Sequence, residues 1–131
     1  MKGKMPAFMG KNCKMYATMQ TTMTNKLFVY GTLGPGRPNE HILKAIGGTW
    51  EEGVVLGNLK NEGWGAAMGY PGIILDEKGG KVTGNIFTSD QLVNHWEYLD
   101  AFEGLAYERV VTTVFLADES QVEAYVYVLR Q

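Results

Sequence analysis

Residues 99–109 read Leu-Asp-Ala-Phe-Glu-Gly-Leu-Ala-Tyr-Glu-Arg and join a predicted helix, Ser89 to Leu99, to a predicted strand, Tyr107 to Leu116. Glu103 therefore lies where a helix gives way to a strand. Gly104 follows it, and glycine tolerates the left-handed backbone that commonly ends a helix. A carboxylate just before such a turn can be held rigidly and directed into a cavity, where it can transfer protons. An exposed glutamate is the alternative, and this stretch alone favours it.

Size and composition indicate one ordinary globular domain. The chain has 131 residues, enough for one hydrophobic core. A net charge of −2 gives no general attraction to nucleic acid or to a membrane, and neither partner is expected. No run of about 18 apolar residues is present, so no transmembrane helix is expected. The single cysteine, Cys13, cannot form an internal disulfide, which fits a reducing compartment, and we expect a cytoplasmic location.

The first part of the chain differs from the rest in charge and pattern. We predict that residues 1–25 are an extension or a disordered tail, and that residues 26–131 form the domain, with a natural start near Met23. All fourteen acidic residues lie from Glu40 onward. Methionines recur in the extension at a spacing that suits a helical stripe, but its glycines and its proline oppose a stable helix.

The remaining pattern alternates short strands with one more helix. Strands are predicted for Lys26–Tyr30, Thr49–Leu59, Pro71–Leu75, Lys81–Phe87, Tyr107–Leu116 and Val122–Leu129, and a helix for Glu40–Ile46 behind a capping Asn39. Gly53 and Gly57 are expected to allow bends or close packing within one strand. In the last strand one face would carry Val122, Ala124, Val126 and Val128, and the other Glu123, Tyr125 and Tyr127. We predict an α+β protein: a small mixed β-barrel with short helices packed outside.

The first predicted strand ends in Tyr30-Gly31-Thr32-Leu33-Gly34-Pro35-Gly36. So many small residues after a strand can expose several backbone N–H groups to one point, and such a nest binds carboxylate or phosphate. The spacing excludes a phosphate-binding P-loop and the Gly-x-Gly-x-x-Gly dinucleotide motif. An ordinary glycine turn is the alternative, which these residues alone favour.

Other candidates for catalysis are few. His41 and His95 are the only histidines and fall in separate predicted helices, so a surface role is expected for each and no metal site is predicted. Cys13 falls in the predicted extension. Asp100 lies three residues before Glu103 and can share its helix face, although a structural role is favoured.

Further side chains near the opening stretch have two interpretations each. Tyr107 has two equally favoured interpretations. It is either the wall of a pocket, with a hydroxyl for a substrate, or a packed strand residue. Packing is slightly favoured over a cavity role for Tyr127. Arg109 and Glu108 are expected to pair with strand neighbours rather than with a substrate.

Three segments together carry a family resemblance. They are Tyr30-Gly31-Thr32-Leu33, then Tyr70-Pro71-Gly72-Ile73 with Val82-Thr83-Gly84-Asn85-Ile86-Phe87, then Leu99-Asp100-Ala101-Phe102-Glu103-Gly104 followed by Tyr107. In this order and spacing they resemble the gamma-glutamylcyclotransferase-like family, which includes the AIG2-like and YtfP-like proteins. The resemblance extends from about Asn25 to the C-terminus and implies a compact mixed β-barrel with a cavity.

The resemblance also implies a site and a reaction. Glu103 would be the catalytic acid/base, and the substrate-binding residues would be Tyr30, Gly31, Thr32, Leu33 and Tyr107, the loop holding the anionic end of the substrate through backbone N–H groups. The reaction would cyclise a small-molecule gamma-glutamyl compound to 5-oxoproline and release an amine or amino acid. The α-amine attacks the side-chain carbonyl, so no water is consumed, and no metal or cofactor is expected.

One carboxylate can take a proton from that amine and return one to the leaving nitrogen. Partial burial near Phe102, Tyr107 and Trp96 is expected to raise the pKa of Glu103 into a useful range. Two other functions are left open: a non-catalytic small-molecule-binding or regulatory domain of the same fold, and an interaction protein that uses the basic residues 1–26. The leaving group and the oligomeric state are not specified by the sequence.

Overall fold

The computed structural model describes residues 24–131. The predicted extension, with Cys13 and the predicted start at Met23, therefore lies outside the described residues apart from its last two positions. Those two contact the domain: the Thr24 hydroxyl donates to the Glu123 carbonyl (3.1 Å), and Asn25 Nδ2 donates to Asp90 Oδ1 (2.9 Å). None of the helices in the described part of the chain is long and apolar enough to cross a membrane.

The elements follow the predicted order. They are β2 (Lys26–Val29), α1 (Glu40–Ile46), β3 (Thr49–Lys60), the 3-10 turn η2 (Trp64–Met68), β4 (Gly72–Leu75), β5 (Gly80–Thr88), the 3-10 turn η3 (Leu92–Asn94), α2 (Trp96–Glu103), β6 (Tyr107–Phe115) and β7 (Gln121–Leu129). The strands agree with the prediction to within a residue or two at most ends. The helix Glu40–Ile46 agrees at both ends.

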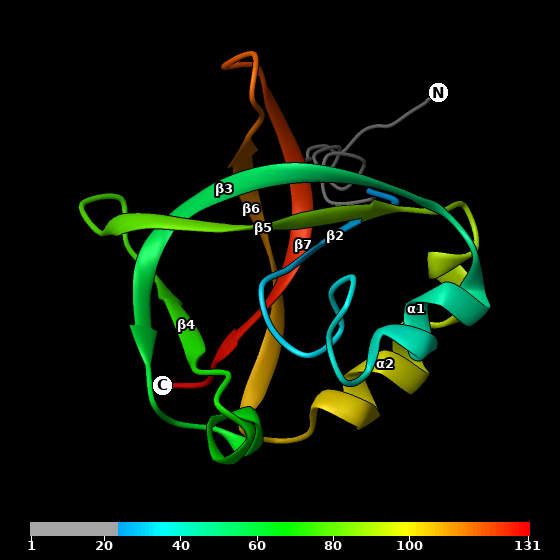
Figure 1. Cartoon of the computed structure of the whole chain (residues 1–131), viewed down its shortest axis with the longest axis horizontal. Coiled ribbons are helices and arrows are strands. Elements are labelled where there is room, and N and C mark those ends of the chain that lie inside the picture. The colour runs from blue at the N-terminus through cyan, green and yellow to red at the C-terminus, as the bar shows by residue number, and fades with distance from the viewer. Residues whose placement is uncertain (1–23) are drawn as a thin grey trace, which may run out of the picture.

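The strands form a closed, mixed barrel. Their order is β4-β3-β5-β2-β7-β6, and a further pairing of β3 with β6 at Val54 and Phe115 closes the last five strands into a ring. The β2–β7 pair is parallel and the other pairs are antiparallel. Figure 1 shows β3 curving around the other strands, with β4 attached beside its end. The predicted fold class, an α+β protein with a small mixed β-barrel, is confirmed.

Close packing at the closure depends on a glycine, as the sequence predicted. A Cβ atom on Gly53 would lie 2.6 Å from Cγ1 of Val114, which is nearer than real Cβ contacts come. The next residue, Val54, makes the pair that joins β3 to β6. A side chain at Gly53 would therefore push these two strands apart.

The wall of the barrel near β2 and β7 is buried on both faces. The interior cluster contains Phe28, Val55, Ile73, Val82, Ile86, Val114, Ala124, Val126 and Val128. The second cluster packs Leu27, Val29, Tyr127 and Leu129 against Leu43 of α1 and Leu99 of α2. Each fully buried aliphatic side chain contributes about 1.5–3 kcal/mol. The two predicted faces of the last strand are confirmed. Both helices lie on the outside of the barrel (Figure 1).

The predicted helix Ser89–Leu99 is wrong in its bounds. Ser89 Oγ accepts the Gln91 N–H (3.1 Å), so this serine supports the short turn η3 rather than a long helix. His95, with φ −126°, separates η3 from α2. Val93 is 62% exposed, although its spacing would place it on the buried face of one continuous helix. The helix that matters for the site therefore starts later and runs through to its last residue, Glu103.

Candidate functional site

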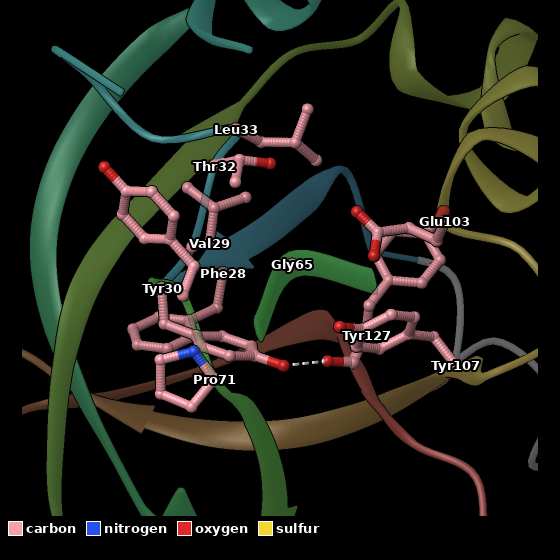
Figure 2. A pocket seen from close by; sticks show the side chains of 12 residues that line it. Phe28, Val29, Tyr30, Thr32, Leu33, Gly65, Pro71, Glu103, Tyr107 and Tyr127 are labelled. Carbon is pink, nitrogen blue, oxygen red and sulfur yellow. Dashed lines mark hydrogen bonds between the residues drawn. The ribbon is translucent and has the colours of Figure 1, made fainter. Parts of the chain in front are cut away.

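A pocket of about 40 Å³ lies where the end of β2 meets α2, β6 and β7. It is lined by Phe28, Val29, Tyr30, Gly31, Thr32, Leu33, Gly65, Tyr70, Pro71, Glu103, Tyr107 and Tyr127. All six residues that the sequence singled out for the site are among them. The two predicted parts of the site, some seventy positions apart in the chain, thus face one space (Figure 2).

The loop after β2 is held from outside the pocket. The predicted cap of α1 by the Asn39 side chain is wrong, because this side chain makes no hydrogen bond to the first turn of the helix. Its Nδ2 donates instead to Thr32 Oγ1 (3.0 Å), and its N–H donates to the Thr32 carbonyl (2.8 Å). The Gly34 N–H donates to the Gly31 carbonyl (3.2 Å). These bonds occupy the Gly31 and Thr32 carbonyls and the Thr32 hydroxyl, and none of them uses the N–H groups of Gly31, Thr32 or Leu33.

Three successive backbone donors of this loop have no acceptor in the described part of the chain. Within residues 24–131, the N–H groups of Gly31, Thr32 and Leu33 donate to no carbonyl or side chain. Thr32 and Leu33 are buried. An unpaired buried N–H costs about 1–3 kcal/mol, so such groups are expected to have another partner, and consecutive donors suit an anion.

Glu103 enters the pocket from the opposite side. It is the last residue of α2 and only 8% exposed. Figure 2 shows its carboxyl directed into the pocket above the rings of Tyr107 and Tyr127. Burial raises the pKa of the Glu103 carboxyl from 4.5 to about 7. This group therefore changes its protonation state near neutral pH, as the sequence analysis expected.

Two contacts fix the backbone at Glu103. Trp64 Nε1 donates to the Glu103 carbonyl (2.9 Å), and the Gly104 N–H donates to the Asp100 carbonyl (3.0 Å). Gly104 has φ +86° and ψ −176°, so it ends the helix with a positive φ, as predicted. The conformation is extended rather than left-handed helical, and essentially only glycine adopts it.

Tyr30 and Tyr107 both line the pocket, and burial raises the pKa of each hydroxyl. The Tyr30 hydroxyl donates to the Tyr127 carbonyl (2.7 Å) and accepts the Ile73 N–H (3.0 Å), and burial raises its pKa further above the usual range. Its hydroxyl thus serves the backbone, and Tyr30 offers the pocket its ring. Tyr107 begins β6 and also lines the pocket, so it is both a strand residue and part of the pocket wall. Burial first, and then the nearby Glu103, raise the pKa of its hydroxyl.

A family model described as gamma-glutamyl cyclotransferase, AIG2-like, matches residues 27–131. The chain belongs to this family. The resemblance seen in the sequence is confirmed by this match.

Individual proteins and solved structures are also similar to this AIG2-like chain. The protein named "Putative gamma-glutamylcyclotransferase BH1612", from Halalkalibacterium halodurans, is 39% identical over 79 residues. That match spans 55% of this chain and 64% of the relative, which is just under two thirds of its length. The crystal structure of an AIG2-like protein from Mus musculus has a TM-score of 0.62 and 27% identity, covering 80% of this chain and 76% of that one. YkqA from Bacillus subtilis has a TM-score of 0.62 and 28% identity, covering 82% of this chain and 36% of that one.

Several other candidate residues of this AIG2-like chain lie outside the pocket. His41 is exposed on α1, and His95 lies between η3 and α2. Residues 24–131 hold no group of three or more histidine, cysteine, aspartate or glutamate side chains that could bind a metal ion. Of the three rings expected around Glu103, only Tyr107 lines the pocket: Phe102 packs edge-on against Trp64, and Trp96 against Tyr125.

Asp100 and Arg109 form an ion pair beside the pocket. Arg109 Nε donates to Asp100 Oδ1 (2.8 Å). The arginine therefore pairs with a residue of α2, and the expected pairing with a strand neighbour is wrong. Tyr127, for which packing was favoured, packs in the outer cluster and also lines the pocket. Trp64 had no predicted role and Tyr127 only a secondary one, because their contacts with α2 span 39 and 27 residues of sequence and leave no local pattern.

Replacing Gly104 with alanine is expected to destabilise the protein by about 1–3 kcal/mol. A Cβ on Gly104 would meet nothing within 4 Å, so the cost comes from backbone strain alone. Urea unfolding of both proteins measures it. Gly80→Ala is the matched control, since a Cβ there also meets nothing and Gly80 lacks a positive φ. Equal stability of the Gly104→Ala and Gly80→Ala proteins would contradict the role given to this turn.

Proposed function

We propose that this protein converts a gamma-glutamyl amine or peptide into 5-oxoproline and a free amine, with Glu103 as the acid/base. One observation carries the proposal: a buried carboxyl whose pKa is raised to about 7 shares a small pocket with three unpaired backbone N–H groups. Membership of the AIG2-like family, and a relative named for this activity, support the reaction class.

In this proposal the N–H groups of Gly31, Thr32 and Leu33 donate hydrogen bonds to the α-carboxylate of the gamma-glutamyl group. The carboxylate is thereby fixed on one wall, and the α-amine beside it faces the Glu103 carboxyl. The hydrocarbon chain of the substrate folds against the ring of Tyr107 so that the amine meets the side-chain carbonyl. Well-oriented intramolecular reactions reach effective molarities of about 10⁵–10⁸ M, so holding this folded shape is a large part of catalysis.

Glu103 then moves the protons. The ionised carboxylate takes a proton from the α-ammonium group, and the freed nitrogen attacks the γ-carbonyl carbon. The protonated Glu103 gives a proton to the leaving nitrogen, and the original carbon–nitrogen bond breaks. The second proton that the attacking nitrogen loses leaves with the released amine as its ammonium form. One carbon–nitrogen bond forms and one breaks, no water enters, and the products are 5-oxoproline and an amine. A group with a pKa of about 7 suits both halves of this transfer at neutral pH.

The test is incubation with a panel of gamma-glutamyl amino acids, dipeptides and alkylamines, with 5-oxoproline and released amine measured together. We expect at least one compound to give the two products in equal amounts. The alternative, a small-molecule-binding domain without turnover, predicts that compounds of the panel bind but are recovered intact. That result would overturn the proposal.

A further inference from the structure

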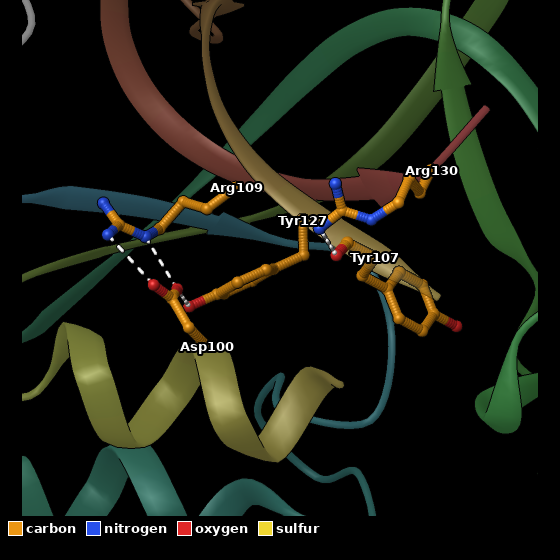
Figure 3. A network of polar contacts seen from close by, with 5 residues as sticks. All are labelled: Asp100, Tyr107, Arg109, Tyr127 and Arg130. Atoms are coloured by element: carbon orange, nitrogen blue, oxygen red, sulfur yellow. Dashed lines mark hydrogen bonds and ion pairs between the residues drawn. The ribbon is translucent and has the colours of Figure 1, made fainter. Parts of the chain in front are cut away.

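Tyr127 contacts both walls of the pocket through different atoms. Its backbone carbonyl accepts the Tyr30 hydroxyl (2.7 Å), and Tyr30 directly precedes the loop of unpaired N–H groups. Its own hydroxyl donates to Asp100 Oδ1 (2.6 Å), and Asp100 lies three residues before Glu103 on α2. Figure 2 shows the first of these bonds and Figure 3 the second. One residue of β7 thus joins the donor loop to the helix that carries the carboxyl.

The Asp100 end of this connection is itself immobilised. Arg109 holds both carboxylate oxygens, Nε to Oδ1 (2.8 Å) and one terminal nitrogen to Oδ2 (3.2 Å). The guanidinium also packs beside two rings that contact each other, 4.3 Å from the Trp96 centroid and 4.7 Å from that of Tyr125. Partial burial raises the pKa of Asp100, but the hydrogen bonds from Arg109 and Tyr127 outweigh it and keep the carboxyl ionised. The Tyr127 hydroxyl therefore meets a charged acceptor in a fixed place, and hydrogen bonds of this type are the stronger ones.

We propose that Tyr127 is a positioning residue for the proposed cyclisation: its carbonyl and its hydroxyl together set the separation between the Gly31–Leu33 donors and Glu103. This inference rests on the proposed function. The α-carboxylate and the α-amine of the substrate are joined to one carbon, so the separation of their two partners in the protein must match that fixed geometry. A displacement of about 1 Å in such an arrangement can lower a rate by about 10²-fold.

The placement of Glu103 also controls how far its carboxyl is shielded from water. The titratable groups that face it are the hydroxyls of Tyr30 on the β2 side, Tyr107 of β6 and Tyr127 of β7, all with pKa values raised by burial. In the ion pair of Asp100 with Arg109 the two opposite charges cancel, so the pair adds little net charge near Glu103. Loosening α2 is therefore expected to act on Glu103 mainly by admitting water.

The experiment compares the wild type with Tyr127→Phe, which keeps the ring and the carbonyl and removes only the bond to Asp100. Both proteins are assayed for kcat and KM with the best compound of the panel, and the Glu103 carboxyl is titrated by ¹³C NMR. We expect kcat to fall by about 10- to 100-fold, with KM changed by less than about threefold. We expect the Glu103 pKa to fall from about 7 by roughly one unit.

Asp100→Ala and the double variant Tyr127→Phe/Asp100→Ala provide a second test. Because both single changes break the same bond, the double variant is expected to be no slower than the slower single variant. Asp90→Ala is the matched control, since it removes an exposed bond to Asn25 and neither residue lines the pocket, so kcat should be unchanged. If Tyr127→Phe does not fold, Asp100→Ala breaks the same bond from the other side.

The inference is overturned if Tyr127→Phe loses only thermal stability while kcat and the Glu103 pKa stay at wild-type values. Additive rate losses in the double variant would also overturn it. The NMR titration needs no turnover. If no compound of the panel reacts, the proposed function fails. The Glu103 pKa in Tyr127→Phe then still tests the inference: a lowered pKa supports a positioning role for Tyr127, and an unchanged pKa contradicts it.

Discussion

Glu103→Gln is expected to lower the rate of 5-oxoproline formation by about 10²–10⁴-fold, the usual contribution of a general acid/base. Glutamine has nearly the same shape and fills the same space, but its amide cannot take a proton from the α-amine or return one to the leaving nitrogen. The donors of the Gly31–Leu33 loop are untouched, so KM is expected to change far less than kcat. Initial rates at pH 8 for the best compound of the panel measure both constants.

Glu97→Gln is the matched control for this result. Glu97 lies on the same helix, α2, but is exposed, so its loss removes the same charge from the protein without touching the pocket. Its rate is expected to stay within about twofold of the wild type. A Glu103→Gln protein that retains wild-type kcat would remove Glu103 from the mechanism.

The same substitution is expected to stabilise the fold at high pH. The folded-state pKa of Glu103, about 7, is raised above its ordinary value of 4.5. Below pH 4.5 the carboxyl is protonated in the folded and unfolded states, and the shift has no effect on stability. As the pH rises from 4.5 to about 7 the unfolded chain ionises first, so the wild type loses about 3 kcal/mol of stability, and the loss is then constant.

Glutamine carries no titrating group, so Glu103→Gln escapes that loss. The free energy of unfolding of the variant, relative to the wild type, should increase by about 3 kcal/mol between pH 4 and pH 8. Any cost of burying the amide is the same at both values and cancels in the difference. Urea unfolding at the two pH values measures it, with Glu97→Gln expected to show little change. A relative stability that is independent of pH would mean that the Glu103 carboxyl is hydrated.

Greater stability together with lost turnover is the combination expected of a functional group that is buried at a cost to the fold. A carboxyl kept only for folding would behave in the opposite way, since its replacement would lower stability at neutral pH. The two predictions for Glu103→Gln therefore support each other, although one concerns rates and the other equilibrium unfolding.

Local signals predicted α1 and the strands well. In Glu40–Ile46 the apolar residues Ile42 and Leu43 are both buried, and Gly47 ends the helix with φ +85° and an N–H donated to the Leu43 carbonyl. The segment before Glu103 was harder. Apolar residues at Leu92, Trp96 and Leu99 suit one continuous helix as well as a 3-10 turn followed by a helix, so the spacing could not place the break at His95.

The same distinction between local and long-range signals applies to the site. The resemblance predicted which residues would meet, and the six of them do line one pocket. Neither the resemblance nor the local pattern predicted what holds them there. The Trp64 bond to the Glu103 carbonyl and the two bonds of Tyr127 join segments that are distant in sequence, and aromatic residues at such positions look the same as ordinary core residues.

The central claim is that the Gly31–Leu33 donors and the Glu103 carboxyl bind one small molecule between them. Its most direct test is an NMR titration of ¹⁵N- and ¹³C-labelled protein with 5-oxoproline, the proposed product, which carries the carboxylate and the ring nitrogen. The account predicts that the amide signals of Gly31, Thr32 and Leu33 and the carboxyl signal of Glu103 shift together and saturate at the same concentration. Saturable shifts confined to other parts of the protein, with these four signals unmoved, would contradict it.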